Sequence, residues 1–182
     1  MRKCTIVSII LFISILSMNC VANPDVFERA LWPDDRDSSG TLGVSIIESV
    51  AIRVCTDVEQ VANGSNVDVV SGDCIDPYTG ESLSVADAKL DRIVSLEVAH
   101  MSGAHSWDQA RRTEFAMDPM NLVLVSESTL SLKRNEGINT WLPSVNFQCE
   151  YVRIYAEVKR KYDLHMSSQE NDIFSQACLV GY

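Results

Sequence analysis

Residues 90–104, which read LDRIVSLEVAHMSGA, contain the pattern on which the fold prediction depends. Apolar residues dominate residues 90–96 and predict a strand, and the polar and small residues at 102–104 break that pattern. A helix is predicted for residues 108–115, and the apolar run at 121–125 predicts a second, buried strand. This part of the chain therefore predicts two strands separated by a loop and a helix.

The flanking segments add further elements of both kinds. Apolar residues recur at helical spacing across residues 46–54. Residues 67–75 predict a strand, and the Pro and Gly of the turn at 76–80 lead into a partner at 83–85, which makes a hairpin. The chain is therefore expected to have an α+β fold.

The C-terminal part predicts two helices. The first has one apolar stripe, formed by Tyr151, Tyr155, Val158 and Tyr162. Ser167 and Glu170 have the spacing of a capping box and predict a last helix that reaches Cys178. The aromatic stripe is interpreted as core packing and not as a surface on which nucleotide bases stack.

The N-terminus has the pattern of an export signal. Two positive charges, Arg2 and Lys3, precede an apolar run at 6–18 that is too short to cross a bilayer as a stable helix. Small residues favour cleavage after Ala22. The alternative is a lipoprotein anchored through Cys20, which the preceding Asn disfavours. We therefore expect an exported protein, periplasmic or secreted, and interpret residues 1–22 as a signal peptide.

The rest of the chain predicts an arm and one domain. Residues 23–42 are rich in Asp, Ser, Gly and Pro without a period, which indicates a flexible arm. Residues 43–182 are long enough for a single domain with its own core. They contain no apolar run of membrane-spanning length, so no membrane span is expected in the mature chain.

The chain is acidic. The formal net charge is −10, and it becomes −12 after export because the leader contains two positive charges and no acid. A negative field repels phosphate backbones at long range and counts weakly against a nuclease. Acidic surfaces also keep exported proteins soluble, and a local basic patch is compatible with a negative total.

Four cysteines remain after removal of the leader, at Cys55, Cys74, Cys149 and Cys178. An even number in an exported chain predicts two disulfides. Of the three possible pairings we favour the sequence-local one, Cys55 with Cys74 and Cys149 with Cys178. A zinc site is the weaker alternative, because the sequence has no Cys-x-x-Cys pair and no nearby pair of histidines.

Several polar residues around the two predicted central strands are candidates for catalytic or metal-binding roles, namely Asp91, His100, His105, Asp118 and Asn121. Their spacing alone is weak evidence for such a site. A lone histidine is more often a surface or hydrogen-bonded residue than a ligand.

A family resemblance strengthens this signal. Residues 90–104 resemble the first motif of exported HNH endonucleases related to the C-terminal domain of GmrSD-type restriction enzymes. Further matches follow in the family's order, at Trp107, Arg112, Phe115 to Pro119, Asn121, Leu122, Lys133, Trp141 to Pro143, Cys149 to Tyr151, Val158, Lys159, Tyr162 and Leu164. Upstream, Cys55, Cys74 and residues 76–80 also resemble the family, so the likeness covers residues 52–178.

The resemblance implies a ββα-metal core with flanking helices, in which two strands and a helix hold one divalent cation. It also implies a histidine at the end of the first strand that acts as general base on the attacking water. Asp91, Asn121 and Asp118 are the candidate metal ligands. Their carboxylate and amide oxygens suit Mg²⁺ or Mn²⁺ better than Zn²⁺.

The chain departs from the family pattern at its chemical positions. The family's Asp-His pair is Asp91-Arg92 here, and an arginine stays protonated and cannot act as a general base. Leu130 stands on the following helix where the family has an Asn that binds the metal, and Met117 replaces another Asn. The resemblance therefore implies phosphodiester hydrolysis that is weakened or lost.

Three hypotheses follow. An altered metal-dependent nuclease would use Asp91, with His100 or His105 as base and Arg92 or Lys133 against the phosphate charge. A non-catalytic scaffold would bind nucleic acid, DNA ahead of RNA, through Arg92, Lys133 and Arg134, or bind an envelope protein, with no metal required. The third is a structural exported domain with no role in nucleic-acid binding. We favour the second.

Overall fold

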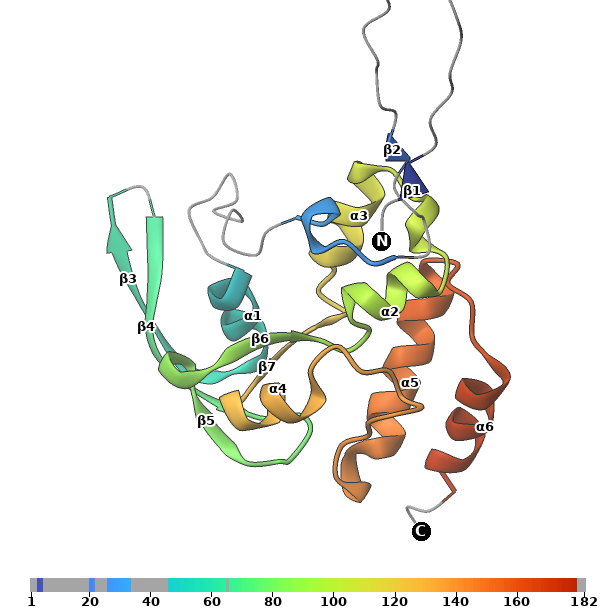
Figure 1. The fold of residues 1–182 in the computed structure, drawn as a ribbon. Coiled ribbons are helices and arrows are strands. Elements are labelled where there is room, and N and C mark those ends of the chain that lie inside the picture. Colours follow the sequence, from blue (N-terminus) through green and yellow to red (C-terminus); the bar gives the residue numbers. More distant parts are fainter. Residues whose placement is uncertain (1–2, 5–19, 22–25, 34–45, 65, 180–182) are drawn as a thin grey trace, which may run out of the picture.

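The structure is a computed structural model that describes residues 3–4, 20–21, 26–33, 46–64 and 66–179 (Figure 1). Its elements, in chain order, are β1 (Lys3–Cys4), β2 (Cys20–Val21), η1 (Arg29–Leu31), α1 (Ile46–Val54), β3 (Thr56–Asn63), β4 (Asn66–Ile75), β5 (Ser82–Ser84), η2 (Val85–Asp87), β6 (Lys89–Arg92), α2 (Leu96–Met101), η3 (Ala104–Ser106), α3 (Gln109–Ala116), β7 (Leu122–Val125), α4 (Glu127–Lys133), α5 (Val145–Lys161) and α6 (Ser168–Ala177). Most of the predicted signal peptide, and residues 23–25 and 34–42 of the predicted arm, lie outside the described residues.

Strands β6 and β7 form the centre of the fold. They pair antiparallel, with Lys89 opposite Val125 and Arg92 opposite Leu122. Figure 1 shows them between the β3–β4 hairpin with α1 on one side and helices α5 and α6 on the other. Helix α4 follows β7 directly, and the Ser126 side chain caps it by accepting a hydrogen bond from the backbone of Thr129. The predicted strands at 90–96 and 121–125 therefore exist and are neighbours.

The first of these strands is shorter than the sequence pattern predicted. Strand β6 ends at Arg92, and residues 96–101 form helix α2 instead of extending the strand. The Ser95 side chain accepts a hydrogen bond from the backbone N–H of Val98, and this cap begins the helix. His100 consequently lies on a helix and not in a loop, and its side chain is buried.

The predicted hairpin is confirmed, because β4 and β5 pair antiparallel with Cys74 opposite Leu83. Strand β3 was not predicted from the sequence. It pairs with β4, and seven of its eight residues are exposed, so it lacks the alternation of a half-buried strand. The Cys55–Cys74 disulfide ties the start of β3 to β4.

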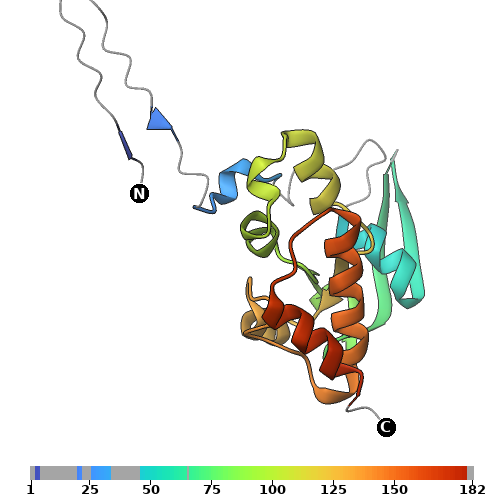
Figure 2. The ribbon, with the colours of Figure 1, turned by 90° about the vertical axis from the view of Figure 1, so that its right-hand side faces the viewer.

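Helices α5 and α6 lie side by side at the C-terminal end (Figure 2). The Cys149–Cys178 disulfide joins them, so both favoured cysteine pairings are confirmed. Ser167 and Glu170 form the predicted capping box at the start of α6. Among the described residues, no helix has the length and apolar character needed to cross a bilayer.

Two apolar clusters pack the elements together. The larger joins the arm, the residues that follow β6, the end of β7, α2, α3 and α5, and its largest side chains are Trp32, Tyr78, Phe115, Tyr151, Tyr155 and Tyr162. The smaller joins α1, β4 and β7 around Val50, Cys74, Leu122 and Leu124. The α+β class is therefore confirmed, and the aromatic stripe on α5 is core packing.

A buried ion pair connects α5 to α6. Lys159 Nζ lies 2.6 Å from Glu170 Oε1, and both side chains are buried. Burial tends to raise the pKa of Glu170, but the bonds from Lys159, Tyr155 and the Ser167 backbone lower it overall. The folded state therefore gains stability from this carboxylate above its unfolded pKa of about 4.3, and loses it as the pH falls through the lower folded value.

Glu170→Gln should destabilise the protein at pH 7 by about 3–5 kcal/mol, because the ammonium of Lys159 would remain buried without its counter-charge. The difference from wild type should shrink as the pH falls towards 3, where the wild-type carboxylate becomes protonated. Urea unfolding at pH 7, 5 and 3 measures both effects. Glu157→Gln is the control: this half-exposed glutamate pairs with Arg153 at the surface of α5, so its loss should change stability by less than about 0.5 kcal/mol. An equal difference at all three pH values would contradict the assignment.

Candidate functional site

The predicted site residues Asp91 and Lys133 meet at the end of β6. Lys133 Nζ lies 3.0 Å from Asp91 Oδ2 and 3.3 Å from Oδ1, and it also donates a 2.7 Å hydrogen bond to the carbonyl of Arg92. Lys133 has no exposed side-chain surface, and Asp91 is 6% exposed. The charge of Asp91 is therefore neutralised by an ammonium group of the protein itself.

A third residue, Tyr78, completes this cluster. Its hydroxyl donates a 2.7 Å hydrogen bond to Asp91 Oδ2. Burial raises the pKa of Tyr78 well above its ordinary value, and the neighbouring charge of Asp91 raises it further, so the phenol remains a donor. Sequence reasoning missed Tyr78, although it lies within the 76–80 turn motif, because a motif match does not show where a phenol points.

The turn at residues 76–80 places Tyr78 in this position. Asp76 Oδ1 accepts a hydrogen bond from the backbone of Tyr78, and Oδ2 accepts one from the backbone of Ser126 at the start of α4. Gly80 has a φ of 77°, and a Cβ there would come within 2.5 Å of the Phe147 ring. The turn therefore requires glycine and holds Tyr78 against the central strands.

Arg92, at the position where the HNH resemblance predicts a histidine, is largely buried at 8% exposure. Its Nε donates a 3.0 Å hydrogen bond to the carbonyl of Ala116, at the end of α3. This bond fixes the guanidinium between α3 and the central strands.

Asn121, just before β7, holds the residues that follow β6 through its side-chain amide. Its Oδ1 accepts a 2.8 Å hydrogen bond from the backbone N–H of Val94, and its Nδ2 donates a 3.0 Å bond to the carbonyl of the same residue. The side chain has no exposed surface. Both polar atoms of the amide therefore hold the turn that follows β6.

The remaining candidates have other partners. Asp118 Oδ2 lies 2.7 Å from Lys161 Nζ. Burial tends to raise the pKa of Asp118, but bonds from Lys161 and the Met120 backbone lower it overall. His100 stacks edge-on against Phe27, and its carbonyl lies 3.3 Å from His105 Nδ1.

The residues that the resemblance nominates as metal ligands do not fit a cation in this arrangement. Asp91 is engaged by an ammonium and a phenol, Asn121 by the backbone, and Asp118 by Lys161. Within the part of the chain that the structure describes, no group of three or more His, Cys, Asp or Glu side chains could hold a metal ion.

A cavity of about 320 Å³ opens beside Asp91 and Arg92. We call it the arginine cavity. Its lining contains three arginines and one acid, and consists of Phe27, Arg29, Leu90, Asp91, Arg92, Ser95, Leu96, Leu130, Arg134 and Asn135. Asp91 is the one acid among the described lining residues, and its carboxylate pairs with Lys133.

One wall of the arginine cavity comes from residues 26–33, part of the segment expected to be a flexible arm. Trp32 is only 4% exposed and packs edge-on against Trp107 and Phe115. Arg112 lies over the Trp32 ring and donates a hydrogen bond to the carbonyl of Leu31. This part of the arm is therefore held against the domain by aromatic packing, and it brings Arg29 to the cavity.

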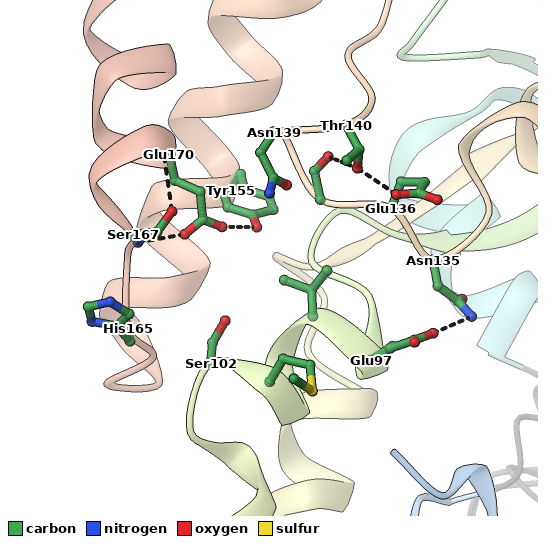
Figure 3. Close-up of a pocket in the computed structure, with 13 residues that line it drawn as sticks. Glu97, Ser102, Asn135, Glu136, Asn139, Thr140, Tyr155, His165, Ser167 and Glu170 are labelled. Atoms are coloured by element: carbon green, nitrogen blue, oxygen red, sulfur yellow. Dashed lines mark hydrogen bonds between the residues drawn. The ribbon is translucent and has the colours of Figure 1, made fainter. Parts of the chain in front are cut away.

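A second cavity, of about 390 Å³, has a different lining (Figure 3). Its described lining includes Glu97, Glu136 and Glu170 but neither lysine nor arginine, and Glu170 pairs with Lys159 behind the wall. The close-up shows Glu170 bound to Tyr155 and Ser167 along one wall.

Comparison with known proteins finds a protein of Arthroderma benhamiae described as an uncharacterized secreted protein. It is 35% identical over 150 residues, which are 80% of this chain and 71% of the relative. No family model matches the chain, and no solved structure matches it.

Lys133→Met should destabilise the protein by about 3–5 kcal/mol, because the carboxylate of Asp91 would remain buried without a counter-charge. The double variant Lys133→Met with Asp91→Asn should recover part of that loss, since the buried charge is then removed as well. Denaturant unfolding of both variants and of Asp91→Asn completes the cycle. Additive effects of the two substitutions would show that the pair is not coupled.

Proposed function

We propose that this chain, which belongs to the same family as the secreted protein of Arthroderma benhamiae, is itself exported and binds nucleic acid on an HNH-like scaffold without hydrolysing it. Export is supported by the secreted relative and by the two disulfides, which form in oxidising compartments. DNA is the first expected partner, with RNA as the alternative.

The observation that carries this proposal is the internal neutralisation of Asp91. A metal-dependent nuclease needs its carboxylate to face a cation that offsets charge on the phosphate. Here the ammonium of Lys133 binds both oxygens of that carboxylate. Tyr78 donates the remaining hydrogen bond to Asp91. The carboxylate therefore contributes to the packing between β6 and α4.

The second support is the side chain that replaces the base. A general base must accept a proton from water, and a guanidinium has five N–H donors and no acceptor. Arg92 is instead suited to binding an anionic oxygen, and it lines the arginine cavity. The exchange of histidine for arginine therefore favours binding over hydrolysis.

The mature wild-type protein should leave supercoiled plasmid DNA and RNA uncleaved in Mg²⁺, Mn²⁺, Zn²⁺ or Ni²⁺. It should bind DNA with an affinity that falls as salt concentration rises. Gel electrophoresis and fluorescence anisotropy measure the two properties. Metal-dependent cleavage by the wild type would refute the non-hydrolytic proposal, and absence of salt-dependent binding would refute nucleic-acid binding.

Arg92→His combined with Leu130→Asn should not create metal-dependent cleavage, although the pair restores a base and an amide ligand, because Lys133 still binds both carboxylate oxygens of Asp91. The triple variant that adds Lys133→Met leaves that carboxylate open to a cation and should cleave supercoiled plasmid in Mg²⁺ or Mn²⁺. Without Arg92→His, the remaining double variant should cleave at least about 100-fold more slowly than the triple variant, given the usual contribution of a general base. The control variant, Arg153→His with Leu132→Asn and Lys133→Met, places the base and the amide on exposed helix positions and should remain inactive. Cleavage by Arg92→His with Leu130→Asn alone would contradict the role given to Lys133.

A further inference from the structure

We infer that Asn63 is an N-glycosylation site, which is modified as the chain passes through an endoplasmic reticulum. Asn63, Gly64 and Ser65 form the acceptor sequence for this modification, in which a hydroxyl residue follows the asparagine by two positions. No other asparagine in the sequence has Ser or Thr at that spacing. The modification requires the proposed export of the chain, and it does not depend on nucleic-acid binding.

The acceptor asparagine lies at the exposed end of the β3–β4 hairpin. Asn63 is the last residue of β3 and pairs with Asn66, the first residue of β4. Gly64 has a φ of 65°, which suits a tight hairpin turn. Apart from its chain neighbours, no heavy atom of the described residues lies within 4 Å of a Cβ added there. Figure 1 shows the hairpin on the opposite side of the molecule from α5 and α6, so an attached oligosaccharide has room.

The amide of Asn63 can accept an oligosaccharide and keep its present contact. An oligosaccharyltransferase forms a bond between Nδ2 and C1 of the sugar, while the bond from C1 to a lipid diphosphate breaks. The amide loses one proton, and the lipid diphosphate leaves. Nδ2 retains its second N–H, so it can still donate the 2.8 Å hydrogen bond that it makes to Asp68 Oδ2.

Two observations support the compartment in which this transfer takes place. The lumen of the endoplasmic reticulum is oxidising, and the protein contains two disulfides. The relative from Arthroderma benhamiae is a fungal protein, and fungal cells export proteins through that lumen. The disulfides and the acceptor sequence are therefore consistent with the same route of export.

A glycan on Asn63 would cover an apolar part of the hairpin. Val61 is 47% exposed and lies two positions before Asn63, so both side chains are on the same face of β3. Val70 is 52% exposed and shares a face of β4 with Asp68, to which Asn63 is bonded. Among the described strands, β3 lies at the edge of its sheet. Exposed apolar edges favour association between chains, and a bulky polar glycan on the same face opposes it.

Secretion of the full chain by a fungal host tests the assignment. Peptide-N-glycosidase should increase the mobility of the secreted protein in denaturing gels. Release in water with labelled oxygen should convert Asn63 to a labelled aspartate, which peptide mass spectrometry detects. A secreted protein without an N-glycan would overturn this inference alone. A chain that stays in the cytosol without its disulfides would overturn the proposed export as well.

Substitutions assign the glycan to one residue. Asn63→Gln and Ser65→Ala should each abolish the mobility shift, whereas Ser65→Thr, which keeps a hydroxyl, should retain it. Ser65→Ala keeps the amide that bonds to Asp68, so its effect separates glycosylation from folding. Asn139→Gln is the control and should keep the shift, because Asn139 is also exposed but has Trp141 two positions later. A shift that persists in Asn63→Gln and Ser65→Ala would overturn the assignment.

Association between chains provides a separate readout of the glycan. Concentrated Ser65→Ala protein should lose more material to aggregates in size-exclusion chromatography than the glycosylated wild type, because Val61 and Val70 are uncovered. Adding Val61→Thr should reduce that loss. Equal losses from the Ser65→Ala protein and the wild type would contradict the covering role of the glycan.

Discussion

The buried contact of Lys133 with Asp91 is the interaction on which the centre of this fold depends. It joins the last turn of α4 to β6, and Tyr78 joins the same carboxylate to the turn at residues 76–80. Removal of one partner would leave a charge in a site with almost no access to water. At such a position the HNH resemblance predicts a metal ion as the source of positive charge; in this protein an amino-acid side chain supplies it.

A lysine in place of the predicted metal ion affects both the stability of the fold and the chemistry that the site can perform. A bound metal can be exchanged or can polarise water, whereas a lysine in the core cannot leave. The carboxylate therefore stabilises the fold permanently, and the surface beside it is left with arginines.

Much of the fold could be predicted from the sequence because its signals are local. The capping box at Ser167, the aromatic stripe on α5 and the buried strand at 121–125 all depend on neighbours within a few residues. Strand β3 could not be predicted, because its exposed residues have no alternating pattern. The site was predicted only in part: Asp91 and Lys133 were candidates, but their pairing and the role of Tyr78 depend on packing between residues up to 42 positions apart.

The docking of Trp32 has a consequence for the order of folding. Its neighbouring carbonyl, at Leu31, bonds to Arg112, a residue 81 positions later in the chain. A chain that is synthesised from its N-terminus contains Trp32 long before α3 exists to receive it. Contacts of such long range form late and slow the completion of folding. The arginine cavity, whose wall includes this segment, is therefore expected to be among the last parts of the protein to form.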